Sequence, residues 1–289
     1  MSATALALVV VAAFIHAYWN FLVKRAAGGV AFIWLFSLAT AVLYAPIIIL
    51  LLAVDPPEHY GGMHWLLILI SGMLHLLYAI TLSRGYKVAD LSVVYPIARG
   101  TGPLLSCLIA ITLLGERPSA TGWVGIALIV AGVFLIAAAG GRSEDVNKRK
   151  AQGVFYGGLT GVCIAAYTIN DAYAVKLLLV SPLLLDYFGN LVRLLFLTPS
   201  ALSSRAALRE QWNKNLRLSI AVGALMPLSY ILALFAMRFA PISYVAPARE
   251  LSMLIGALLG AKLLHEGNTV QCVSGTILMI AGMIALALA

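Results

Sequence analysis

Ten apolar stretches, each of roughly 20 residues, follow one another along the chain with only short connections between them. A helix needs about 20 mostly apolar residues to cross the hydrocarbon core of a bilayer, where each segment has to satisfy its own backbone hydrogen bonds. The sequence therefore predicts an all-α membrane protein with ten transmembrane helices. The predicted spans cover residues 3–23, 30–53, 65–83, 90–113, 120–139, 152–174, 179–200, 217–237, 242–264 and 269–288.

The amount of charge excludes an ordinary soluble domain. Hydrophobic residues make up 62% of the chain and charged residues 10%, whereas about a quarter of the residues in a soluble domain are charged. The three cysteines, Cys107, Cys163 and Cys272, lie in apolar stretches without the CxxC spacing of a redox or zinc site. We interpret them as small buried hydrophobic residues, and the sequence predicts neither a metal nor a cofactor.

Lys and Arg are distributed unevenly between alternate connections. The connections after the odd-numbered spans hold thirteen of them: Lys24, Arg25, Arg84, Lys87, Arg142, Lys148, Arg149, Lys150, Arg205, Arg209, Lys214, Arg217 and Lys262. The opposite connections hold three: Arg117, Lys176 and Arg238. Because cytoplasmic loops carry the excess of Lys and Arg, we expect the first set in the cytoplasm and both termini outside. Topology then accounts for the net charge of +8, and nucleic acid is not expected as a partner.

The two halves of the chain resemble each other at an offset of 150 residues. LLGERPSATGWVGIALIVAG matches LLHEGNTVQCVSGTILMIAG, which pairs Glu116, Gly125 and Gly132 with Glu266, Gly275 and Gly282. Upstream, SVVYPIAR matches SYVAPAR, which pairs Arg99 with Arg249. We predict a first five-helix repeat at residues 1–140, a charged cytoplasmic linker at 141–150 and a second five-helix repeat at 151–289.

An odd number of spans in each repeat makes the second copy enter the membrane from the opposite side, so the repeats are expected to be inverted. Inverted repeats are typical of transporters, which open a site near the bilayer midplane to either side in turn. The paired glycines, which recur every seven residues, predict a close helix contact between the halves or between subunits. We interpret Glu116 and Glu266 as structural, because a carboxylate suits the start of a helix.

These motifs resemble the drug/metabolite transporter superfamily, in its EamA-like branch. The resemblance rests on an Ala-Tyr segment in the first helix of each repeat, a proline and polar residues early in the fourth, and a Gly-Glu or His-Glu turn before the fifth. It covers essentially the whole chain. It implies a carrier in a bacterial inner membrane, often an exporter of amino acids or related metabolites. It also implies a cavity between the first four helices of each repeat, lined by the fourth and ninth.

Six Arg, Asp and Glu side chains lie well within the predicted spans: Arg99, Asp171, Asp186, Arg193, Arg249 and Glu250. Each costs about 2.5–3.5 kcal/mol on insertion scales, so each is a candidate site residue. Arg99 and Arg249 are the strongest candidates, because a guanidinium matches the geometry of a carboxylate. The alternative is that they form structural salt bridges with the acidic residues. Arg193 and Asp186 fit a structural role equally well.

Polar and aromatic residues at helical spacing give further candidate walls of a site. His16, Trp19 and Asn20 share one face of the first span, and His75 and Tyr78 share one face of the third. The complete set of predicted substrate-binding residues is Arg99, Arg249, Glu250, Tyr95, His16, Trp19, Asn20, His75, Tyr78, Asp171 and Tyr187.

The balance of three arginines and three carboxylates inside the spans favours a zwitterionic cargo. The expected function is a secondary transporter that moves an amino acid or similar zwitterion across the inner membrane by alternating access, as an exporter. A multidrug or organic-cation exporter and an organic-anion or phosphonate carrier are the alternatives. An intramembrane enzyme is a remote one, because no GxSxG, HExxH or Walker motif is present.

The expected partners are a small-molecule substrate and the lipid bilayer. Glu250 and Asp171 are the carboxylates that could exchange a coupling proton. The sequence leaves a monomer and a homodimer both open.

The charge distribution makes a prediction about topology. Alkaline phosphatase fused after Ala289 is expected to be active, because the enzyme folds only outside the cytoplasm and the Lys and Arg count places the C-terminus there. A fusion that is inactive at this position, while one placed after Arg217 is active, would contradict the predicted orientation.

Overall fold

The structure is a computed structural model that describes residues 1–289 except 27, 55, 57–59, 90, 139–146, 254 and 256–269. The described residues form helices and short connections, with no strand among them. The helices are α1 (Ala3–Ala26), α2 (Gly29–Val54), α3 (Gly62–Val88), α4 (Leu91–Leu113), α5 (Ala120–Ala138), α6 (Asn147–Lys176), α7 (Pro182–Ser203), α8 (Arg205–Phe239), α9 (Ile242–Ala248) and α11 (Val270–Leu288).

Each predicted span overlaps one of these helices. Within the described residues, α1, α2, α3 and α8 are long and apolar enough to cross a membrane by length and composition. Shorter apolar helical segments run over Ile97–Leu113, Ala120–Leu135 and Val273–Leu288. The described part of the chain is therefore all-helical, with several segments that are long and apolar enough to span a membrane. Lys262, Glu266 and most of the predicted linker lie outside the described residues.

Two helices, α6 and α8, begin five or more residues before the predicted spans. α8 starts at Arg205, twelve residues before residue 217, because the intervening RAALREQWNKNL is rich in strong helix formers. One ion pair on this extension joins Lys214 to Glu210 one turn earlier, at 2.8 Å. α6 starts at Asn147, inside the predicted linker. Both charged extensions continue the apolar helices beyond their hydrophobic stretches.

The ninth span differs from its prediction as one continuous helix. α9 ends at Ala248, and Arg249 and Glu250 form a turn before the chain becomes helical again at Leu251. Pro247 has no backbone N–H, so it leaves the carbonyl of Ser243 without its helical donor. Cys107 on α4 supplies a replacement, since its Sγ donates to that carbonyl at 3.2 Å. The turn therefore holds two charged residues at a break in the helix.

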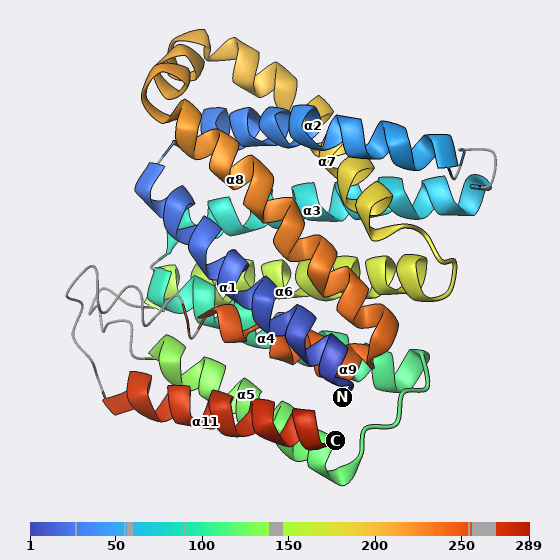
Figure 1. Cartoon of the computed structure of the whole chain (residues 1–289). Helices are drawn as coiled ribbons and strands as arrows, with labels where there is room; N and C mark the ends of the chain where they lie inside the picture. Colours follow the sequence, from blue (N-terminus) through green and yellow to red (C-terminus); the bar gives the residue numbers. More distant parts are fainter. Residues whose placement is uncertain are drawn as a thin grey trace.

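The helices pack into a bundle with one separate pair at its side (Figure 1). α1 and α2 pack on α8, while α6 and α7 pack on α3, so the first two helices of each half contact the third helix of the other. α6 also packs on α4. The N-terminal ammonium of Met1 donates to the carbonyl of Leu286 at 3.2 Å, which brings both ends of the chain together.

The separate pair consists of α5 and α11, which meet at glycines. A Cβ atom on Gly132 would lie 2.7 Å from the carbonyl oxygen of Gly275, and one on Gly125 would lie 2.9 Å from that of Gly282. Gly125 thus faces Gly282 while Gly132 faces Gly275, which means that the two helices run antiparallel. From the sequence, these glycines could mark a contact either between the two halves of the chain or between two subunits. In the structure they form a contact between the two halves of one chain.

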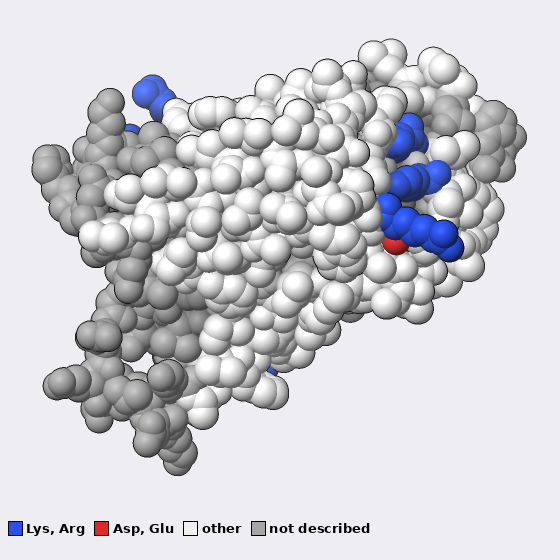
Figure 2. Space-filling model, turned by 90° about the horizontal axis from the view of Figure 1, so that it is seen from below, with Lys and Arg blue, Asp and Glu red and all other residues white. Residues whose placement is uncertain are grey.

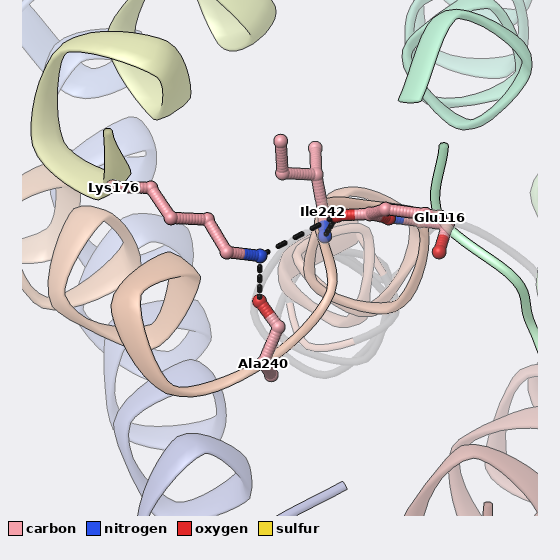
Figure 3. A network of polar contacts seen from close by, with 5 residues as sticks. Glu116, Lys176, Ala240 and Ile242 are labelled. Atoms are coloured by element: carbon pink, nitrogen blue, oxygen red, sulfur yellow. Dashed lines mark hydrogen bonds and ion pairs between the residues drawn. The ribbon is translucent and has the colours of Figure 1, made fainter. Parts of the chain in front are cut away.

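A polar network ties three segments together near the chain termini (Figure 3). The Glu116 carboxylate accepts hydrogen bonds from the backbone N–H groups of Ile242 and Ser243, at 2.8 and 2.9 Å. Lys176 at the end of α6 lies 3.5 Å from Glu116 and donates to the carbonyl of Ala240 at 3.3 Å. Glu116 therefore has the predicted structural role, but it caps the start of α9 in the other half rather than the start of α5, which follows it in sequence.

The surface seen from below is a broad uncharged area with Lys and Arg near its ends (Figure 2). Large apolar side chains are exposed on several helices, including Leu50 at 69% on α2 and Leu195 at 70% on α7. A soluble protein rarely exposes such contiguous apolar surface. This arrangement fits a bundle whose sides face lipid and whose ends face water.

The glycine contact predicts the effect of one added methyl group. Gly132→Ala is expected to destabilise the protein by about 1–3 kcal/mol, because the new Cβ meets a backbone carbonyl that has no room to move. Gly158→Ala on α6 is the matched control, since a Cβ there meets nothing within 4 Å. Thermal unfolding in detergent measures both. Equal melting temperatures for the two variants would contradict the close contact.

Candidate functional site

A cavity of about 80 Å³ lies inside the bundle, between α1, α3, α4, α6, α7, α8 and the turn that follows α9. Its walls combine guanidinium groups, imidazoles and phenol rings with one carboxylate. Such a small set of polar groups in an otherwise apolar bundle is typical of a ligand site. The lining residues are His16, Trp19, Ser71, His75, Tyr78, Arg99, Tyr167, Leu185, Asp186, Gly189, Asn190, Arg193, Met226, Pro227, Ser229, Tyr230 and Arg249.

Arg99 forms an ion pair across the two halves of the chain. Its Nε atom lies 3.2 Å from Oε2 of Glu250, and both side chains are largely buried. Its Nη2 atom lies 3.5 Å from Ser252 Oγ and 3.4 Å from Nε2 of His16. Glu250 lines a smaller recess of about 10 Å³ beside the main cavity. The charge of Arg99 is thus already balanced by a protein carboxylate.

Arg249 has a different environment. Its guanidinium carbon lies 5.1 Å from the centre of the Tyr230 ring, a cation–π contact. In the described part of the chain, no carboxylate lies within 4 Å of this guanidinium. The sequence analysis gave the two arginines the same predicted role. Among the described residues, however, only Arg99 forms an ion pair with a carboxylate. Arg249 therefore presents its charge to the cavity.

The buried carboxylate of Asp171 holds the Tyr230 ring, which contacts Arg249, in place. The Tyr230 hydroxyl donates to Oδ2 of Asp171 at 2.5 Å, and Nδ2 of Asn170 donates to Oδ1 of Asp171 at 2.9 Å. Asn170 in turn donates to the carbonyl of Leu67 on α3, at 3.0 Å. Asp171 has no exposed surface. These hydrogen bonds hold the Tyr230 ring in position, and the Arg249 guanidinium lies over that ring.

An aromatic wall borders the same space. His75 stacks on Tyr167, with ring centres 4.1 Å apart, and meets Tyr230 edge-on at 5.2 Å. Nδ1 of His75 lies 2.9 Å from the carbonyl of Ser71. A carbonyl only accepts hydrogen bonds, so Nδ1 carries the proton, and in the neutral ring Nε2 is the nitrogen that can accept one. On the α1 side, Nε1 of Trp19 donates to Ser229 Oγ at 3.1 Å.

α7 adds three polar residues that the sequence did not place in the site. Asp186, Asn190 and Arg193 all line the cavity, at positions i, i+4 and i+7 of one helix face. Nη2 of Arg193 donates to Oδ1 of Asn190 at 2.7 Å. The helical spacing was the available signal, but a structural salt bridge would produce the same spacing.

Several predicted site residues lie elsewhere. Asn20 is exposed and donates to the carbonyl of His16 in its own helix, and the Tyr187 hydroxyl donates to the carbonyl of Ala41. Asp171 lies behind Tyr230 and is not part of the cavity wall. A helix face spans about a third of the circumference, so spacing alone did not separate the cavity from neighbouring helix contacts. The Tyr95 side chain lies outside the described residues.

Comparison with known proteins finds one family match, in the first half of the chain. A family model described as EamA-like transporter family matches residues 3–138. No curated protein matches the chain. A solved structure titled "Crystal structure of protein" is similar to it with a TM-score of 0.74 and 15% sequence identity, over 100% of this chain and 99% of that one. At this identity the likeness concerns the fold alone.

The contacts of Tyr230 make a prediction about stability. Tyr230→Phe is expected to destabilise the protein by about 1–3 kcal/mol, because it removes a donor from a fully buried carboxylate. Tyr44→Phe is the matched control, since the Tyr44 hydroxyl donates to a neutral carbonyl, that of Ala224, at 2.7 Å. Thermal unfolding in detergent measures both variants. A Tyr230→Phe protein that is no less stable than Tyr44→Phe would contradict the role of Asp171.

Proposed function

We propose that the chain, whose residues 3–138 match a family model described as EamA-like transporter family, is a secondary carrier for a small zwitterion. The cargo is an amino acid or a similar metabolite, and the carrier exports it across a bacterial inner membrane by alternating access. Both termini lie in the periplasm. The two carrier halves are residues 1–140 and 151–289, joined by a cytoplasmic linker.

The observation that carries this proposal is the set of charges around the cavity. Arg249 faces the cavity without a described carboxylate partner, and Asp186 lines the same cavity. A guanidinium presents a planar fork of donors that fits a carboxylate, and Asp186 suits an ammonium group. One site thus offers complementary charge to both groups of an amino acid.

The contacts between the halves support alternating access. Gly125 and Gly132 on α5 meet Gly282 and Gly275 on α11, and the sequence repeat pairs Gly125 with Gly275 and Gly132 with Gly282. An antiparallel contact between equivalent helices is what a two-fold axis in the membrane plane would produce. The crossed packing of α1 on α8 and of α6 on α3 follows the same rule.

The same charges argue against the other carriers. An organic-cation exporter needs a carboxylate without nearby cations, but Arg99, Arg193 and Arg249 line the cavity around Asp186. In a carrier for simple anions, the Asp186 carboxylate in the cavity wall would repel the cargo.

The proposal is tested by transport into proteoliposomes. Counterflow of a labelled amino acid is expected to be competed by amino acids and not by organic cations or simple carboxylates. Competition by organic cations alone would contradict a zwitterionic cargo.

A variant assigns the binding role to Arg249. Arg249→Lys is expected to lower transport at least tenfold, because an ammonium retains the charge but not the fork of donors. Arg209→Lys, on the exposed part of α8, is the matched control and is expected to transport normally. Equal transport by the two variants would return Arg249 to a structural role.

A further inference from the structure

One charged group in the cavity is not explained by a simple amino acid. Arg249 and Asp186 suffice for one carboxylate and one ammonium, yet Arg193 lines the same cavity. An arginine inside a membrane protein is costly and is normally paired. In the described part of the chain, no carboxylate lies within 4 Å of Arg193. The described residues therefore provide no carboxylate at contact distance to balance the charge of Arg193.

The Arg193 side chain is held in a defined position. Its Nη2 donates to Oδ1 of Asn190, and Nδ2 of that amide donates to the carbonyl of Ser37 on α2 at 3.0 Å. Asn190 is 4% exposed, so this arrangement is buried. The guanidinium also lies over the ring of Phe36, with 5.8 Å between the guanidinium carbon and the ring centre. The guanidinium is thus oriented before any cargo arrives.

A donor of this guanidinium has no acceptor. Nε of Arg193 is buried, and among the described residues it makes no hydrogen bond. A buried donor without a partner costs roughly 1–3 kcal/mol, and more on a charged group. An oxyanion on the cargo would provide both the missing acceptor and the missing charge, through the bidentate geometry that arginine favours.

We propose that the cargo is a zwitterion with a second oxyanion group, such as an acidic amino acid or an amino acid whose side chain ends in a phosphonate or sulfonate. Arg249 binds one oxyanion, Arg193 binds the other, and Asp186 binds the ammonium. This inference rests on the proposed transport function and specifies the substrate class of the same site. Two anionic groups and one cationic group on the cargo mirror the two arginines and one carboxylate of the cavity that lack a described ion-pair partner.

The test compares acids with amides of nearly the same shape. In proteoliposomes, unlabelled L-glutamate is expected to compete in counterflow at least tenfold better than L-glutamine, and L-aspartate better than L-asparagine. In Arg193→Gln the ratio of acid to amide is expected to fall at least tenfold. Arg193→Lys, which keeps the charge but not the planar fork, is expected to give an intermediate ratio, and Arg209→Gln is the control that keeps the wild-type ratio.

The outcomes separate this inference from the proposed function. If no amino acid competes, the zwitterion carrier itself is contradicted. If glutamine competes as well as glutamate in the wild-type protein, the transport function survives and the second oxyanion site is overturned. This comparison needs no variant, so it decides the point even if the Arg193 variants fail to fold. An unchanged ratio in a folded Arg193→Gln protein would equally overturn the role of Arg193.

Discussion

The ion pair between Arg99 and Glu250 determines how charge is divided within the bundle. It joins α4 of the first half to the turn that follows α9 in the second, with 3.2 Å between Nε and Oε2. Removing one partner of such a buried pair costs about 3–5 kcal/mol, because the remaining charge is left uncompensated. Glu250 neutralises Arg99 and so leaves Arg249, its neighbour in sequence, to face the cavity.

The two repeat-related arginines therefore have different surroundings: Arg99 pairs with Glu250, whereas Arg249 lies over the Tyr230 ring. The residue after Arg99 is Gly100, whereas the residue after Arg249 is Glu250. A Cβ atom on Gly100 would lie 2.5 Å from Cζ of Phe134, so a side chain there would have to displace the Phe134 ring. Among the described residues that line the cavity, the first half therefore supplies only one of the arginines and no carboxylate. In the proposed transport function, the second half recognises the charges of the cargo, through α7 and the turn after α9.

The sequence predicted the helices well because their apolar stretches have the length that a bilayer demands. It also identified the glycines that bring α5 and α11 together, since small residues at fixed spacing have few other uses in a membrane helix. It did not predict the turn at Arg249 and Glu250, because a proline in a helix can bend it, break it or leave it intact depending on what satisfies the freed carbonyl. Here the answer depends on Cys107, which lies 136 residues away from Ser243 in sequence.

Half of the site was equally hard to derive from the sequence. His16, Trp19, His75, Tyr78, Arg99 and Arg249 do line the cavity. For Asp186 and Arg193 the sequence left a structural role and a site role equally open, and the lack of a contact within 4 Å between their charged groups in the structure favours the site. The partner of a charged group depends on side-chain direction across helices, and one helix face can serve either a cavity or a packing contact.

The central claim is that one cavity in the middle of the bundle opens to each side of the membrane in turn. Met226 lines that cavity and carries no polar group that the site needs, so Met226→Cys in a protein without Cys107, Cys163 and Cys272 provides a probe. A membrane-impermeant thiol reagent is expected to label this cysteine both in right-side-out and in inverted vesicles, and L-glutamate is expected to slow labelling from either side. Labelling from one side alone, unaffected by cargo, would contradict the account.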